Sequence, residues 1–266
     1  MSILNKIVGD KRREIAIKKS VVSVNQLSKS DLFDRQTISL ASALSISNSG
    51  IIAEHKRRSP SKMNINNNLS VEEVVKGYEN AGVCGISILT DMKYFGASIE
   101  DLVLARASVS IPILRKEFII DEYQIIEAKA NGADAILLIA SILTQSEIRI
   151  FSELAQSLGL EVLLEVHNLL ELERSLMPSL NMIGVNNRNL ATFEVDLGIS
   201  KRLSEFIPRE FVRISESGIT SAVDITDLKL YGFQGFLIGE SFMKTSNPGK
   251  AASDFIAELE IKEITS

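Results

Sequence analysis

Two opposite charges stand two residues apart at the end of an apolar run, at Glu54 and Lys56 in the segment IIAEHKRRSPSK. Because successive side chains of a strand point to opposite faces, both charges point the same way, with Ile52 beneath them. A charged pair on the buried face of a strand costs several kcal/mol of desolvation unless geometry or a ligand compensates. The pair therefore indicates a functional site rather than a purely structural element.

The same two-residue spacing recurs after three later apolar runs. The pairs are Lys116 and Phe118, Glu165 and His167, and Asn186 and Arg188. Any one pair is more simply interpreted as an ordinary strand end that leaves the sheet for solvent. Recurrence after four runs favours a shared site, because the carboxyl ends of the strands in an eight-fold barrel meet at one face.

Two glycine-containing turns follow the last two apolar runs, at Ser217-Gly218 and at Gly239-Glu240. Small residues let backbone N–H groups approach a phosphate, and the loops after the last two strands of α/β barrels commonly bind one. Either turn alone is weak evidence for a phosphate site, since glycines also occur at strand ends for steric reasons. Together they predict a phosphate site.

The elements that must position these residues are short apolar runs that alternate with segments of helical periodicity. The runs span residues 51–54, 85–89, 111–114, 135–139, 161–166, 182–185, 211–214 and 235–238. Helices are predicted over residues 71–80, 121–130, 145–158 and 221–231. Continuous apolar strands that alternate with helices are typical of a parallel sheet covered by helices.

A weak internal repeat supports this alternation, because a glycine closes a helix and a strand begins about three residues later. It occurs at Gly82, Gly132, Gly159 and Gly232. Eight β/α units favour the α/β class and a closed (β/α)8 TIM barrel over an open doubly wound sheet. We expect one domain over residues 1–266, with an N-terminal helical extension at 1–48 and the barrel at 49–266.

Composition excludes several classes of protein. The net charge of −5 and pI near 5.3 argue against a general nucleic-acid binder. Cys84 is the single cysteine and there are two histidines, so the sequence predicts no zinc cluster and fits the reducing cytoplasm. No apolar run approaches the ~20 residues of a membrane span. Residues 1–20 are interrupted by acidic side chains, which predicts a helix packed on the domain rather than a secretory signal.

Taken in order, the strand-end motifs resemble those of the indole-3-glycerol-phosphate synthase family of tryptophan biosynthesis. The matching segments are IIAEHKRRSPSK, SILTDMKYFGAS, ILRKEFIID, GADAILLIASIL, LLEVHN, IGVNNRNL, SESGI and FLIGESFM. They cover nearly all of the chain after residue 50, and the N-terminal extension is also similar to the family's. Eight ordered motifs are far more specific than any one of them.

The resemblance implies ring closure, decarboxylation and dehydration of 1-(2-carboxyphenylamino)-1-deoxyribulose 5-phosphate, a carboxy-lyase reaction that gives indole-3-glycerol phosphate. By similarity, Lys116 is the general acid of ring closure, and Glu165 carries the proton transfers of dehydration. Lys56 binds the substrate carboxylate and is a second candidate for dehydration. Glu54 and Asn186 orient the lysines and the sugar hydroxyls. Which lysine acts in which step stays open.

The resemblance also implies a set of binding residues. Ser59, Ser61, Phe95 and Phe118 form the anthranilate end, and Leu137 walls the ring. Arg188, Ser217, Gly218, Gly239 and Glu240 lie where the family handles the sugar phosphate. A carboxylate would repel a phosphate, so Glu240 is assigned a backbone contact only. The chemistry requires no metal or other cofactor, and the expected partner is a small-molecule substrate, with a monomer or weak homo-oligomer in solution.

Two other functions compete with this one. The run Lys56-Arg57-Arg58, with Lys62, is a candidate basic address or nucleic-acid patch, although most such runs are solvated surface. Alternatively, the same barrel could isomerise a phosphorylated aminosugar, since fold alone does not fix function. Two lysines with one glutamate favour the synthase, because an isomerase needs no site for a carboxylate that is lost.

Overall fold

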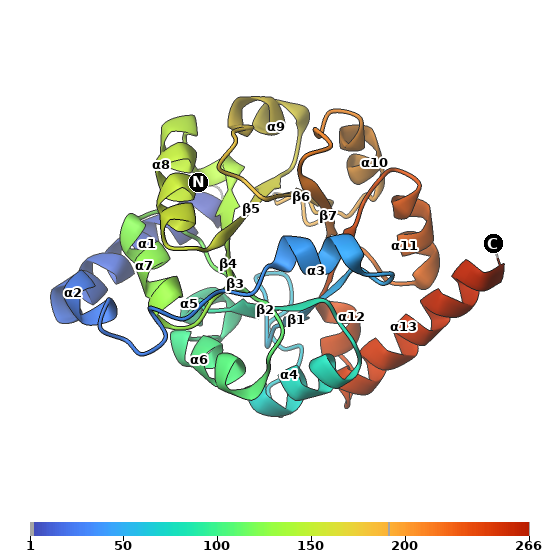
Figure 1. The fold of residues 1–266 in the computed structure, drawn as a ribbon, viewed down its shortest axis with the longest axis horizontal. Coiled ribbons are helices and arrows are strands. Elements are labelled where there is room, and N and C mark those ends of the chain that lie inside the picture. Colours follow the sequence, from blue (N-terminus) through green and yellow to red (C-terminus); the bar gives the residue numbers. More distant parts are fainter. Residues whose placement is uncertain (1–2, 191, 266) are drawn as a thin grey trace.

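Residues 3–190 and 192–265 are described by a computed structural model, in which eight parallel strands close into a barrel (Figure 1). The strands are β1 (Ile51–His55), β2 (Gly85–Leu89), β3 (Ile113–Lys116), β4 (Ala135–Ile139), β5 (Glu161–Val166), β6 (Met182–Asn186), β7 (Val212–Glu216) and β8 (Gly235–Ile238). Each strand pairs with the next, and β8 pairs with β1. The predicted (β/α)8 barrel is therefore confirmed.

Helices surround the barrel on its outer side (Figure 1). They are α4 (Val71–Asn80), α5 (Met92–Phe95), α6 (Ile99–Ser108), α7 (Glu122–Ala130), the 3₁₀ turn η1 (Ala140–Ile142), α8 (Gln145–Ser157), α9 (Leu169–Ser175), α10 (Gly198–Ser204), α11 (Ala222–Lys229), α12 (Glu240–Met243) and α13 (Pro248–Thr265). The four helices predicted by periodicity are α4, α7, α8 and α11. Capping boxes begin three of them, at Ser70, Thr144 and Ser221, which satisfies backbone N–H groups that a helix leaves free.

The third strand lies two residues later than the predicted run 111–114. Pro112 has no backbone N–H and cannot donate to the strand ladder, so the regular strand begins at Ile113. The shift brings Lys116 inside the strand, where it pairs in register with Leu89 of β2. Lys116 is thus held by the sheet and not by a loop.

The glycines of the predicted repeat all end helices in the left-handed conformation. Their φ angles are +83° at Gly82, +88° at Gly132, +73° at Gly159 and +81° at Gly232. Residues with a Cβ rarely adopt such angles, so glycine lets the chain leave each helix and return directly to the sheet. The repeat therefore marks the units of the barrel correctly.

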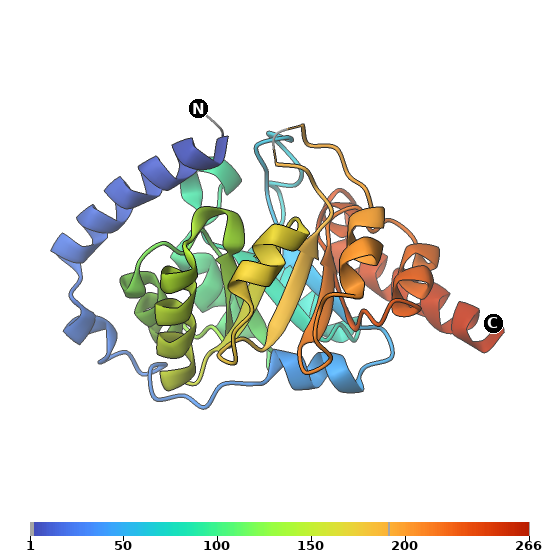
Figure 2. The same ribbon diagram turned by 90° about the horizontal axis from the view of Figure 1, so that it is seen from above.

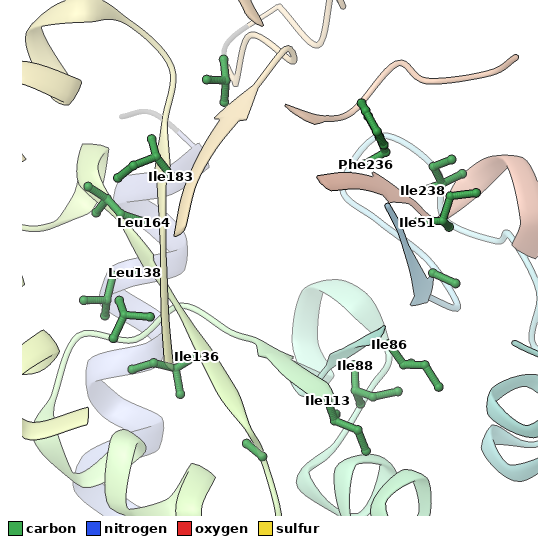
Figure 3. Close-up of a cluster of buried hydrophobic side chains, with 14 of the residues drawn as sticks. Ile51, Ile86, Ile88, Ile113, Ile136, Leu138, Leu164, Ile183, Phe236 and Ile238 are labelled. Carbon is green, nitrogen blue, oxygen red and sulfur yellow. The ribbon is translucent and has the colours of Figure 1, made fainter. Parts of the chain in front are cut away.

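Two apolar layers stabilise the barrel. The outer layer lies between the strands and the helices, and Figure 3 shows Ile86, Ile88 and Ile113 among its members. The inner layer fills the barrel and includes Ile52, Leu114 and Leu137. Because the strands are apolar on both faces, a polar residue that points inward is exceptional and marks the end of the packed interior.

The N-terminal segment covers both ends of the barrel, as Figure 2 shows. Helix α3 (Leu40–Ile46) inserts Leu40 and Leu44 into the inner layer at the amino ends of the strands. Helix α1 (Ile3–Val21) begins beside the carboxyl ends and runs down the outside of the barrel to the short α2 (Val24–Leu27). The predicted N-terminal helix is confirmed. No helix in the described ranges is long and apolar enough to cross a bilayer.

Candidate active site

A cavity of about 670 Å³ opens at the carboxyl ends of the strands. All the residues that the sequence predicted for the site line it. They are Glu54, Lys56, Ser59, Ser61, Phe95, Lys116, Phe118, Leu137, Glu165, Asn186, Arg188, Ser217, Gly218, Gly239 and Glu240. Residues from all eight strands or their following loops thus meet in one place, which is the usual position of a barrel active site.

The charged pair on β1 is intact and points into this cavity. Lys56 Nζ lies 2.7 Å from Glu54 Oε1, and the two side chains are 19% and 4% exposed. Ser87 Oγ on β2 donates to the other oxygen of Glu54 at 3.4 Å. The pair stands directly above the inner apolar layer, so the desolvation expected from the sequence is present.

Lys116 is the most strongly engaged cation of the site. Its Nζ lies 3.0 Å from Glu165 Oε2 on β5 and also contacts Glu216 Oε2 on β7. Burial by itself would lower the pKa of this ammonium, but Glu216 and Glu165 outweigh that cost and raise its pKa above the usual value. Lys116 is therefore protonated and held across the width of the barrel.

Glu165 is kept ionised by its neighbours. Burial alone would raise its pKa, but Lys116, His167 and a hydrogen bond from Asn186 lower it below the usual value. His167 is in turn held by Glu171 of α9, whose Oε2 lies 3.2 Å from His167 Nδ1. His167 thus has the hydrogen-bonded environment of a structural histidine, while Glu165 is free to face the cavity.

Glu216 is a site residue that the motif reading did not single out. Its side chain is 2% exposed, and burial raises its pKa to about 7. Its Oε1 has no hydrogen-bond partner among the described residues. The signal in the sequence was its position two residues after the inward Ile214, at the end of the run FVRISE. The register places it beside Asn186.

The predicted aromatic end of the cavity contains two facing rings. The centroids of Phe95 and Phe118 lie 6.1 Å apart with an interplanar angle of 38°, a separation at which aromatic rings interact favourably. Leu137 lines the cavity from β4, and the hydroxyls of Ser59 and Ser61 lie 3.1 Å from each other. This half of the cavity offers apolar faces together with hydroxyl donors.

The opposite side of the cavity is formed by the loops after β6, β7 and β8. Ser217 and Gly218 both have positive φ, +68° and +86°. Such a conformation at a serine persists only where neighbours enforce it, and Asn187 does so by donating to the carbonyls of Glu216 and Ser217. Asn187 was not predicted, although it stands beside Asn186 in the motif IGVNNRNL.

Gly239 and Glu240 complete this side. A Cβ at Gly239 would lie 2.7 Å from Glu54 Oε1 and 3.1 Å from Glu54 Cβ, so glycine directly after β8 leaves room for the Glu54 side chain in its present position. The side chain of Glu240 is paired with Lys62 of the first loop. Arg188 is half-buried and donates to the carbonyl of Phe193 at 3.1 Å. Gly218 and Gly239 both line the cavity on this side.

The side chains of the basic run that suggested a nucleic-acid patch, Lys56-Arg57-Arg58 with Lys62, are engaged in contacts within the protein. Arg57 forms a two-pronged ion pair with Asp101 of α6, with contacts of 2.5 and 2.9 Å. Arg58 donates to the carbonyl of Met92 at 2.7 Å. Since Lys56 and Lys62 pair with Glu54 and Glu240, this alternative loses its structural basis. Within the described residues, no group of three or more His, Cys, Asp or Glu side chains is arranged to hold a metal ion.

Comparisons with known proteins place the chain among its relatives. The sequence profile described as "Indole-3-glycerol phosphate synthase" matches residues 4–255. A protein of that name from Bacteroides thetaiotaomicron is 46% identical over 97% of this chain and 99% of its own length. One from Carboxydothermus hydrogenoformans is 40% identical over 96% and 99%.

Solved structures agree at the level of the fold. The structure titled "Native KDPGal structure" has a TM-score of 0.58 and 14% sequence identity, and covers 82% of this chain and 96% of its own. A designed protein cage has a TM-score of 0.60 and 15% identity, with 82% and 75% covered. At these identities the likeness concerns the barrel alone.

Proposed function

The chain belongs to the indole-3-glycerol phosphate synthase family, and from this premise we propose that it converts 1-(2-carboxyphenylamino)-1-deoxyribulose 5-phosphate to indole-3-glycerol phosphate, carbon dioxide and water. One observation carries the mechanism: Lys116, protonated and buried, is held between Glu165 and Glu216 at the centre of the cavity. A fixed proton donor in a dry site is what ring closure needs.

In the first step, the ring carbon that bears the carboxylate attacks the ketone of the sugar chain. The carbonyl oxygen gains negative charge, and Lys116 donates its proton to that oxygen as the new carbon–carbon bond forms. The raised pKa of Lys116 keeps it protonated until then, and an alkoxide is basic enough to take the proton. Glu165 and Glu216 hold the ammonium in place before the substrate arrives.

In the second step, the carbon–carboxylate bond breaks and its electron pair returns to the ring, which releases carbon dioxide. Lys56 is placed to hold the carboxylate until this point, because its side chain is partly exposed to the cavity and fixed by Glu54 at 2.7 Å. In the third step, the hydroxyl formed from the ketone takes a second proton from Lys56, the second candidate for dehydration, and leaves as water. The neighbouring ring carbon loses a proton, and the electron pair of that carbon–hydrogen bond forms the double bond of the indole ring. Glu165, ionised and hydrogen-bonded by Asn186, accepts the proton that is lost.

The two ends of the cavity match the two ends of the substrate. Phe95, Phe118 and Leu137 offer apolar faces to the anthranilate ring, with Ser59 and Ser61 near its carboxylate. Arg188 and the backbone of Ser217, Gly218 and Gly239 face the phosphate. Glu240 contributes its backbone only, since its carboxylate is engaged by Lys62. An aminosugar substrate has no aromatic ring and loses no carboxylate, so an isomerase function would not explain the aromatic end of the cavity or Lys56.

Turnover of the carboxyphenylamino substrate by the purified protein tests this function. We expect indole fluorescence to rise and carbon dioxide to be released in equal amount. The chain contains no tryptophan, so the protein adds little background to the indole signal. Product formation without carbon dioxide release would indicate an isomerase, and the absence of both at high protein concentration would overturn the proposal.

A further inference from the structure

Helix α1 carries a buried lysine that the mechanism does not use. Lys11 is 2% exposed and stands between Ile7 and Ile15 on the inward face of the helix. Ile7, one turn before it, and Ile3 and Leu4, two turns before it, line the active-site cavity. A lysine is rarely buried this completely unless it is paired, so its partners indicate its purpose.

Lys11 pairs with Glu14 of its own helix at 2.8 Å and with two carboxylates at the ends of neighbouring strands. Its Nζ lies 2.8 Å from Asp91 Oδ2, two residues after β2, and 3.1 Å from Glu117 Oε1, directly after β3. These side chains are 3% and 1% exposed. Burial alone would lower the pKa of Lys11, but Glu117 and Asp91 outweigh it and raise the pKa above its usual value. The cation therefore neutralises two buried like charges.

Each carboxylate also fixes one wall of the aromatic end. Asp91 Oδ1 accepts from the backbone N–H of Tyr94 at 2.7 Å and so begins α5, which carries Phe95. Glu117 Oε1 accepts from the backbone N–H of Phe118 at 2.8 Å. Lys11 is thus the common tie between the segments that hold the two facing rings.

We infer that Lys11 is a positioning residue that sets the separation of Phe95 and Phe118 and thereby the affinity of the site for an aromatic carboxylate. The inference rests on the proposed function, which assigns the anthranilate ring to these two residues. Without the cation, Asp91 and Glu117 repel each other in a buried setting, and the segments that carry the two phenyl rings separate. Among the described residues, none in the loops after β6, β7 and β8 pairs with Lys11, so we expect the phosphate side of the cavity to keep its shape.

Lys11→Met tests the inference through two probes that report on opposite ends of the cavity. Titration calorimetry measures the affinity for anthranilate and for inorganic phosphate. We expect the Kd for anthranilate to rise about tenfold and that for phosphate to change less than about twofold, with KM rising more than kcat falls. Both probes bind without turnover, so they remain informative even if the proposed reaction fails in the wild type.

Two further variants separate positioning from simple loss of stability. Lys18→Met removes a lysine of the same helix that pairs with Glu127 at 3.0 Å, outside the cavity, and should leave both affinities unchanged. Lys11→Met combined with Asp91→Asn removes one of the two like charges while asparagine still caps α5, so the anthranilate affinity should recover. Should Lys11→Met alone fail to fold, this neutral pair is compared directly with the wild type and is expected to bind anthranilate within about threefold of it.

Equal losses of anthranilate and phosphate affinity in Lys11→Met would overturn the inference, because they would indicate general loosening of the barrel end. So would unchanged anthranilate affinity, or the absence of any recovery in the double variant.

Discussion

Each end of the barrel buries an acidic side chain beside a basic partner, but the two carboxylates differ in how completely their oxygens are hydrogen-bonded. At the amino ends of the strands, Asp134 is fully buried and both of its oxygens are saturated. Oδ1 accepts from Arg35 at 2.7 Å and from the backbone of Ile38 at 2.9 Å. Oδ2 accepts from Arg106 at 2.9 Å and from the backbone of Ile113 at 2.8 Å.

At the carboxyl ends, Glu216 is equally buried but incompletely satisfied. Its Oε2 contacts Lys116, while its Oε1 has no partner among the described residues. An unpaired buried oxygen is costly, and proteins retain such atoms chiefly where a ligand or a proton is to be received. The comparison teaches that burial of charge alone does not identify a site, whereas incomplete pairing beside a cavity does.

The largest effect is expected from Lys116→Met at the carboxyl end. Loss of the proton donor should lower kcat by about 10³-fold to 10⁴-fold, since general acid catalysis and charge stabilisation are removed together. The melting temperature should also fall, because Glu165 and Glu216 lose the cation between them, but the raised pKa of Glu216 lets it take up a proton and limits this loss. Steady-state kinetics and a thermal melt measure both quantities. A variant that unfolds while the folded fraction keeps wild-type activity would make Lys116 structural.

The converse result is expected from Asp134→Ala at the amino end. This change leaves Arg35 and Arg106 without their shared carboxylate and two backbone N–H groups without an acceptor, so it should destabilise the fold by about 3–5 kcal/mol. Urea unfolding measures the loss. The kcat/KM of the folded variant should stay within about twofold of the wild type. A large catalytic defect in folded protein would remove the distinction between the two ends.

A smaller, pH-dependent effect is expected from Glu216→Gln. The folded-state pKa of Glu216, about 7, lies above the ordinary value of 4.5. The folded protein therefore binds more protons between these values, and stability contributed by the protonated form is lost as pH rises toward 7. Glutamine has no such ionisation. The melting temperature of the variant minus that of the wild type should therefore be roughly 2–6 °C larger at pH 8 than at pH 5. Thermal melts of both proteins at pH 5 and at pH 8 measure this. The same difference in melting temperature between variant and wild type at both pH values would contradict the prediction.

Much of the fold could be read from local patterns. The helix-ending glycines and the apolar runs recur along the chain, because in each β/α unit the chain must leave a helix and enter a buried strand of the same sheet. The third strand was placed two residues early, since the apolar Ile111 and Pro112 continue the hydrophobic run although proline cannot join the ladder. The seventh strand, Val212–Glu216, likewise begins one residue later and ends two residues later than the run 211–214, and the other strands agree with their runs to within one residue.

The site could be predicted to the extent that its residues stand at strand ends with the right spacing. Glu54, Lys56, Lys116 and Glu165 met this condition and line one cavity. Lys11 did not, because a lysine on a helix looks like an ordinary solvated side chain until its partners are known. Asn187 likewise acts through contacts with residues 13 or more positions away, such as Ser200 and Ser215.

The sequence by itself determined the alternation of strands and helices, the closed barrel and the types of residue gathered at its carboxyl end. Continuous apolar runs and helix-ending glycines act over a few residues, so local chemistry suffices to specify them. Only the tertiary structure decided which charges are neutralised and which stay incompletely paired. Pairing depends on distances across the barrel, as between Lys116 and Glu216 or between Lys11 and Asp91, and such distances exist only once the eight strands have closed.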